Sequence, residues 1–252
     1  MLEFPGTDGV LFDLGNTLIP FTPKDSMEFV VKWYHSSGLE GSDLPFREFL
    51  DSFRRTVKKE RRRMVQEKWE TSVSYRSRSI VEDLGEIGFD IRGKEKELER
   101  THTPAFSSCL WISRDSINVL KGIRSARGSG GDPVKTALIS NAGDHEAIRA
   151  FLKENDLTEY FDDIVISSEL GYAKPWKDIF QGPVSRLKLD PGRSVYIGDR
   201  YKIDFLASME AGLKPIYIRQ YHTSGEPPEG AGPIEPTITH ILDLIPLLEN
   251  GY

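Results

Sequence analysis

The sequence predicts an α/β protein whose doubly wound parallel sheet is interrupted by a helical insert. Five short apolar runs have the composition of strands buried on both faces, and amphipathic stretches alternate with them. Between Pro20 and about Phe106 the strand-like runs vanish and long polar helical patterns replace them. We therefore expect a discontinuous core domain of residues 1–19 and 107–252, and a helical domain of residues 20–106 that leaves the core just after the first strand.

The core elements can be placed in order along the chain. Asp144 should cap the helix that follows the second strand, and Pro175 should open the helix after the third. The pair Gly182-Pro183 predicts a kink or a break in that helix, and the helix after the fourth strand should end at Gly212. The five strands are expected at residues 9–14, 134–140, 163–168, 194–199 and 214–219.

The insert and the end of the chain show different patterns. Amphipathic stretches at residues 26–38, 46–70 and 74–88 predict the helices of the insert. A Gly- and Pro-rich segment at residues 224–236 predicts a surface loop, which a last strand or helix near residues 238–250 should follow. A domain inserted after the first strand would overhang the carboxyl edge of the sheet, where ligands of such folds bind.

Composition limits the classes of partner. The formal net charge is −6 and the pI is near 5.5, which argues against a surface that attracts nucleic acid or an anionic membrane. The basic stretch at residues 54–68 is interpreted as a solvated helix face, of which one or two arginines could face the core and draw a phosphate into a cleft. Cys109 is the only cysteine, so a reducing, cytoplasmic location without disulfides is expected. No run of about 18 apolar residues predicts a membrane span.

Polar side chains stand where the predicted strands end. Asp13 follows the first strand, Ser140 and Asn141 end the second, and Lys174 lies in the loop after the third. Taken singly, these residues are typical of a turn or helix cap, a Ser/Asn turn and a surface lysine. The five histidines show no metal-ligand spacing and are interpreted as ordinary polar or capping residues.

The most specific local signal is an acidic pair after the fourth strand. The stretch "VYIGDRYKIDFL" ends a buried run in Gly198-Asp199 and places a second acid, Asp204, five residues later. Carboxylate oxygens are the ligands that suit a hard, six-coordinate ion such as Mg²⁺. The pair therefore predicts a magnesium site at the edge of the sheet.

In this order, the stretches "DLGNT", "LISN", "YAKP" and "GDRYKID" resemble the four motifs of the haloacid dehalogenase-like hydrolase superfamily. The resemblance implies a Rossmann-like core with an inserted helical C1 cap. It also implies that Asp13 is a nucleophile that forms an aspartyl-phosphate, with Mg²⁺ held by Asp13, the backbone carbonyl of Gly15 and Asp199. Asp204 would orient that site.

The resemblance assigns roles to the remaining polar residues as well. Ser140 would hydrogen-bond a phosphoryl oxygen, and Lys174 would neutralise the nucleophile and the transferred group. Thr17 and Asn141 are the supporting candidates. The implied activity is a Mg²⁺-dependent phosphatase that hydrolyses a small phosphorylated metabolite.

Gly15 departs from the pattern, because many phosphatases of the superfamily carry there a second Asp that protonates the leaving alcohol. Without it, esters with poor leaving groups should react slowly. Three alternatives stay open. The chain could be a 2-haloacid dehalogenase, a phosphonatase that uses a lysine of the insert such as Lys32, Lys58 or Lys59, or a weakly active domain that binds a phosphorylated ligand. The sequence leaves substrate identity and oligomeric state undetermined.

Overall fold

The computed structural model describes residues 2–221 and 232–252, and within them the core is one parallel sheet. Its six strands lie in the order β3-β2-β1-β4-β5-β6, and each neighbouring pair is parallel. This confirms the predicted doubly wound sheet. The strands are β1 (Gly9–Phe12), β2 (Lys135–Ser140), β3 (Asp163–Ile166), β4 (Ser194–Gly198), β5 (Lys214–Ile218) and β6 (Thr237–Ile238).

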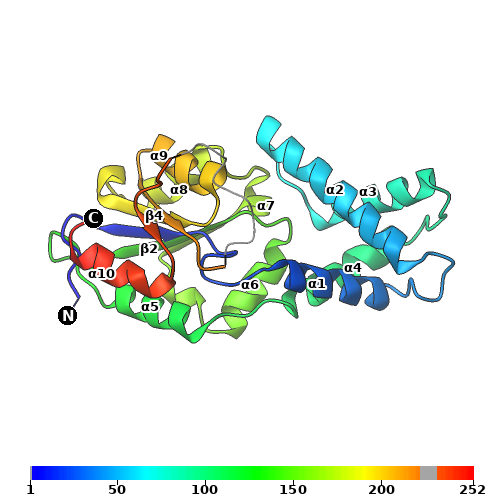
Figure 1. The fold of residues 1–252 in the computed structure, drawn as a ribbon, viewed down its shortest axis with the longest axis horizontal. Coiled ribbons are helices and arrows are strands. Elements are labelled where there is room, and N and C mark those ends of the chain that lie inside the picture. The colour runs from blue at the N-terminus through cyan, green and yellow to red at the C-terminus, as the bar shows by residue number, and fades with distance from the viewer. Residues whose placement is uncertain (1, 222–231) are drawn as a thin grey trace.

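Helices cover both faces of the sheet (Figure 1). In β1, Val10 and Phe12 pack into the cluster on one face, while Leu11 between them packs into the cluster on the other. This alternation follows from the two-residue period of a strand. Because both faces are buried, the sequence of β1 is apolar at every position. One face is covered by α5 (Arg114–Arg124), α6 (His145–Glu154) and α10 (Leu244–Glu249), and the other by α8 (Asp178–Arg186) and α9 (Ala207–Glu210).

The strand order changes direction at β1. The chain runs from β1 outward through β2 to β3, then crosses to the opposite side of β1 to form β4 and β5. The carboxyl ends of β1, β2 and β4 therefore meet at the point where open α/β sheets bind ligands. The loops that carry Asp13, Ser140 and Asp199 begin at these three strand ends.

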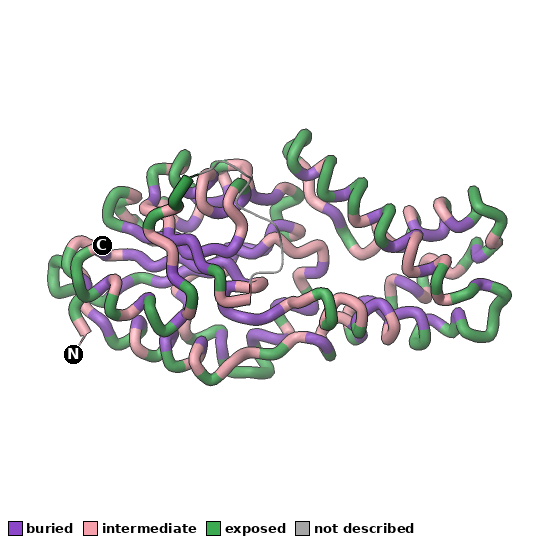
Figure 2. Tube along the Cα trace, viewed as in Figure 1, coloured by how far each residue is buried: buried purple, intermediate pink, exposed green. Residues whose placement is uncertain are grey.

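Four of the five helices between β1 and β2 extend away from the sheet (Figure 1). They bury an apolar cluster of their own around Trp33 and Phe49 (Figure 2). The Trp33 indole donates a hydrogen bond of 2.9 Å to the carbonyl of Leu98, which ties the first of these helices to the fourth. The cluster also includes Cys109, and the domain division at 19/20 and 106/107 stays a prediction. The helices are α1 (Pro23–Ser36), α2 (Phe46–Gln66), α3 (Val73–Glu86) and α4 (Glu95–Ser107).

The structure corrects three details of the core. Pro175 does not open a helix, because α8 begins at Asp178. Helix α8 continues through Gly182-Pro183 without a break, and Pro183 is buried within it at the loss of one helix hydrogen bond, while a kink at this pair stays a prediction. The expected third strand ends at Ile166, and the residues after it form α7 (Ser167–Leu170).

The segment after β4 starts as a π-helix, η3 (Tyr201–Leu206), before it continues into α9. Gly212 follows with a φ of +88°, a left-handed conformation that ends helices and favours glycine. The last expected element is present as both β6 and α10. Most of the predicted surface loop, residues 224–231, lies outside the described residues. None of the described helices is long and apolar enough to cross a bilayer.

Candidate active site

Three buried carboxylates meet at the carboxyl edge of the sheet. Asp13 follows β1, Asp199 follows β4, and Asp204 lies in η3, with one oxygen of each within 4.8 Å of the others. Gly198 makes this possible, because a Cβ at that position would overlap the side chain of Asp204. The backbone N–H of Arg200 donates to Asp204 Oδ2 at 3.1 Å and fixes the turn. The arrangement is an all-oxygen donor set of the kind that binds a hard divalent cation.

Lys174 lies at the centre of the carboxylates and is 1% exposed. Its Nζ donates to Asp13 Oδ1 at 2.6 Å and to Asp204 Oδ1 at 2.7 Å. The hydroxyl of Tyr196, 2.7 Å from the same Nζ, donates in turn to Asp204 Oδ1 at 3.0 Å. Tyr196 comes from the middle of β4, and no sequence signal beyond strand composition indicates that it belongs to the site.

Asn141 holds the Lys174 loop in place. Its Oδ1 accepts the backbone N–H of Lys174 at 2.9 Å, and its Nδ2 donates to the backbone carbonyl of Lys174, also at 2.9 Å. These two bonds engage both ends of the amide. Asn141 therefore positions the lysine, and the phosphate binding expected of it from the sequence stays a prediction.

The electrostatics of the cluster favour a cation. Burial raises the pKa of Asp13 to about 6 although Lys174 opposes the shift. Burial, together with the charges of Asp13 and Asp204, raises the pKa of Asp199 to about 8. Burial alone would lower the pKa of Lys174, but the adjacent carboxylates outweigh it and raise that pKa above its ordinary value. Three acids thus share one ammonium group, and a divalent cation would offset the remaining negative charge.

The other predicted residues lie around this cluster. Thr17 Oγ1 donates to Asp13 Oδ2 at 3.2 Å, so both oxygens of that carboxylate are held. Ser140 ends β2 and is 4% exposed. Gly15 lines the same cavity, and a Cβ added to it would meet no atom within 4 Å. The residues that share the cavity are Asp13, Gly15, Ser140, Asn141, Lys174, Asp199 and Asp204.

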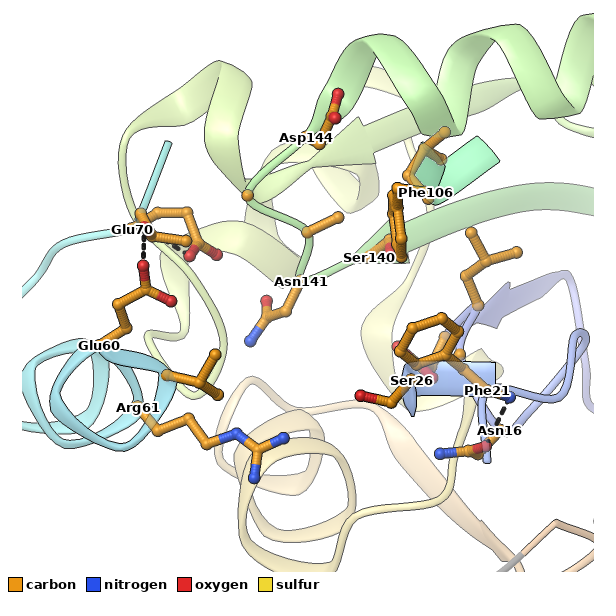
Figure 3. A pocket seen from close by; sticks show the side chains of 18 of the residues that line it. Asn16, Phe21, Ser26, Glu60, Arg61, Glu70, Phe106, Ser140, Asn141 and Asp144 are labelled. Carbon is orange, nitrogen blue, oxygen red and sulfur yellow. Dashed lines mark hydrogen bonds between the residues drawn. The ribbon is translucent and has the colours of Figure 1, made fainter. Parts of the chain in front are cut away.

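The cavity has a volume of about 330 Å³ and lies between the sheet edge and the helices of the insert (Figure 3). One wall is aromatic: Phe106 packs edge-to-face on Phe21 and Phe29, with ring centroids 5.4 and 5.3 Å apart. On another side lie the polar residues Glu60 and Arg61 of α2 (Figure 3). The insert therefore contributes both apolar and charged groups to the site.

A buried polar network joins the insert to the core beside this cavity. Arg76 of α3 forms an ion pair with Glu60 of α2 at 2.7 Å, and its Nη1 lies 3.3 Å from His102 Nε2. His102 Nδ1 lies 2.8 Å from an oxygen of Asp144, the residue that caps α6 as predicted. Burial lowers the pKa of His102 even though Asp144 opposes the shift. The sequence interpretation of His102 as an ordinary polar residue missed this link, because its two partners lie on two other elements, α3 and the start of α6.

Comparison with known proteins gives a family. The haloacid dehalogenase-like hydrolase family matches residues 7–212 of the chain. The pyrimidine 5'-nucleotidase YjjG of Escherichia coli is 37% identical over 83 residues, which cover 32% of this chain and 36% of that protein. The chain spans about a third of the length of the first curated relatives that it matches.

Solved structures with the same fold include enzymes of two activities. The 2-haloacid dehalogenase of Pseudomonas syringae superimposes with a TM-score of 0.67 at 17% identity, over 96% of this chain and 97% of that one. A HAD phosphatase of Thermococcus onnurineus superimposes with a TM-score of 0.65 at 20% identity, over 97% and 99% of the two chains. Identities this low show the fold alone.

Proposed function

The chain belongs to the haloacid dehalogenase-like hydrolase family, and we propose that within it the protein is a Mg²⁺-dependent phosphatase acting on a small phosphorylated metabolite. The observation that supports this most is the buried cluster of Asp13, Asp199 and Asp204 around Lys174. Burying three carboxylic acids together is costly unless a cation binds them, and burial raises the pKa of two of them, Asp13 and Asp199. Lys174 offsets one of these negative charges, and a bound cation would offset the rest.

Asp13, Asp199, Asp204 and the carbonyl of Gly15 are the groups that would hold Mg²⁺. When bound, the ion offsets the repulsion between an anionic nucleophile and an anionic phosphoryl group. Hard oxygen donors in this number match the preference of Mg²⁺, which completes its shell with water and substrate oxygens.

The residues of the chain then have separate roles. The Asp13 carboxylate forms a bond to phosphorus as the ester P–O bond breaks, which gives an aspartyl-phosphate and a leaving oxygen that takes a proton from water. Water next attacks the phosphorus, the bond to Asp13 breaks, and inorganic phosphate leaves. Lys174 and Thr17 hold the two carboxylate oxygens, and Ser140, which lines the cavity, would donate to a phosphoryl oxygen.

Gly15 shapes the substrate range. Because no carboxyl group stands there to protonate the leaving oxygen, substrates with good leaving groups, such as acyl or anomeric phosphates, should react fastest. The same glycine favours a dehalogenase as the second candidate, but the Asp199/Asp204 pair beside Lys174 argues against a reaction without metal.

The structure offers less support for the phosphonatase alternative than for a phosphatase. That chemistry needs a desolvated lysine that reaches the substrate from the insert. Among the described residues, the only lysine that lines the cavity is Lys174. Lys32 forms an ion pair with Glu28 on the surface, and Lys58 and Lys59 are exposed.

We include in the proposal that the insert acts as a cap. It supplies the aromatic wall and Arg61, so its movement against the core would admit substrate and then exclude water. A cavity of this size suits a small metabolite better than a phosphoprotein. A cytoplasmic location, expected from the cysteine content, stays part of this proposal.

The test is a set of hydrolysis assays on purified protein. Hydrolysis of p-nitrophenyl phosphate and of acetyl phosphate is measured in Mg²⁺ and in EDTA. A 2-haloacid and a phosphonate are tested as substrates in the same way. We expect Mg²⁺-dependent release of phosphate by the wild type, lost in Asp13→Asn and kept in the matched surface variant Asp132→Asn. Halide release without metal, or turnover of the phosphonate alone, would replace the proposal by the corresponding alternative.

A further inference from the structure

The cavity has a cationic side that the proposed phosphatase reaction does not use. Arg61 of α2, Arg76 of α3 and Arg200 after β4 all line it. The Arg61 guanidinium points from α2 into the open space, toward the side that carries Ser26 and Asn16 (Figure 3). The transferred phosphoryl group would be bound elsewhere, at the sheet edge with Asp13 and Lys174.

Arg61 and Arg76 differ in their partners. Arg76 is neutralised by Glu60, to which it is joined by three hydrogen bonds of 2.7 to 3.2 Å. The Arg61 guanidinium, in contrast, forms no ion pair or hydrogen bond with any residue in the described part of the chain. An arginine that extends into a cavity and is not paired with a carboxylate is available to an anionic ligand.

The surroundings of Arg61 reinforce this availability. Partial desolvation, followed by the charges of Arg200 and Arg76, lowers the pKa of Arg61. Positive groups from the insert and from the core therefore face one another across the cavity. An anion placed between them would relieve that repulsion and link the two parts of the chain.

We propose that Arg61, with Arg200 on the core side, binds a second anionic group of the substrate, distant from the phosphate that is transferred. The substrate class is a phosphate monoester whose short organic body packs against Phe21 and Phe106 and ends in a carboxylate or a second phosphoryl group. The planar guanidinium fork matches either group by paired hydrogen bonds. This inference rests on the proposed phosphatase activity and adds the substrate class to it.

The experiment uses matched aryl phosphates, which have good leaving groups. Carboxyphenyl and (phosphonomethyl)phenyl phosphates are compared with neutral carbamoylphenyl phosphates of similar shape, each as its meta and para isomer. In the wild type we expect at least one charged ester to exceed its neutral counterpart in kcat/KM by about tenfold, as for one charge-assisted interaction. A preference for the carboxyphenyl ester would indicate a site for a carboxylate, and a preference for the (phosphonomethyl)phenyl ester would indicate a site for a second phosphoryl group.

Three variants test whether Arg61 causes the preference for the charged ester. Arg61→Gln should abolish it while the neutral ester keeps its kcat/KM, and Arg61→Lys should restore part of it. Arg62→Gln, a change of the exposed neighbour on α2 that does not line the cavity, should leave every value unchanged.

The outcomes separate this inference from the activity on which it rests. Equal kcat/KM for charged and neutral esters in the wild type, or equal slowing of both by Arg61→Gln, would overturn the second anion site and leave a phosphatase. Failure of the wild type to hydrolyse any of the esters would count against the phosphatase proposal itself.

Discussion

Replacing Asp199 with Asn should make the metal-free protein less sensitive to rising pH. In the native state burial, with the charges of Asp13 and Asp204, raises the pKa of Asp199 to about 8 from 3.8. Between these values the native carboxyl group keeps a proton that the unfolded chain has lost. Since the native state binds more protons, the free energy of unfolding falls as pH rises through this window.

The size of the change in unfolding free energy follows from the one proton that the native state binds and the unfolded chain does not. A difference of one bound proton changes the free energy of unfolding by about 1.4 kcal/mol per pH unit. From about pH 6.5 to about pH 7.5, above the pKa of about 6 for Asp13, the wild type should lose roughly that amount more than Asp199→Asn. Titration of His102 in the unfolded chain is common to both proteins and cancels in the comparison.

Urea denaturation in EDTA at the two pH values, followed by tryptophan fluorescence, measures the difference. Saturating Mg²⁺ should remove the loss in the wild type, because the bound cation keeps the carboxylates ionised. Equal pH dependence of the two proteins in EDTA would refute the charge argument for the site, whatever activity is found.

Two glycines give further predictions. A Cβ added at Gly15 meets no atom within 4 Å, so Gly15→Asp can supply a general acid and should raise the hydrolysis of an alkyl phosphate about 100-fold or more. The isosteric Gly15→Asn should not raise it. Equal rates of phosphate release by the two variants would contradict this role. Gly198→Ala forces a Cβ into Asp204 and should lower the free energy of unfolding by about 1 to 3 kcal/mol and weaken Mg²⁺ activation. Gly41→Ala, where a Cβ meets nothing within 4 Å, is the denaturation control, and the argument fails if both changes cost the same.

Strand-end residues could be predicted because parallel strands bring their carboxyl ends to one edge. Asp13, Ser140 and Asp199 were found in this way, each next to an apolar run. The location of Lys174 followed from the family motif, since its contact with Asp13 spans 161 residues and no local pattern encodes it. The break predicted at Gly182-Pro183 was wrong, because α8 continues through the buried Pro183.

The side of the site that belongs to the insert could not be predicted. Helical phase shows which residues of α2 share a face, but it does not show which face meets the core, so Arg61 could not be told from its basic neighbours. The bond between His102 and Asp144 joins an insert helix to a core helix and depends on how the two parts pack. The two bonds from Asn141 to Lys174 could not be predicted either, because they form only once the loops are folded.

The central claim is that Asp13 attacks phosphorus, and trapping the phosphorylated enzyme tests it most directly. The protein is quenched in acid during turnover of acetyl phosphate with Mg²⁺, digested, and examined by mass spectrometry. We predict one added phosphoryl group on the peptide that contains Asp13, and none on the same peptide from Asp13→Asn. Turnover that continues in Asp13→Asn would contradict the claim, as would a phosphoryl group carried by another residue.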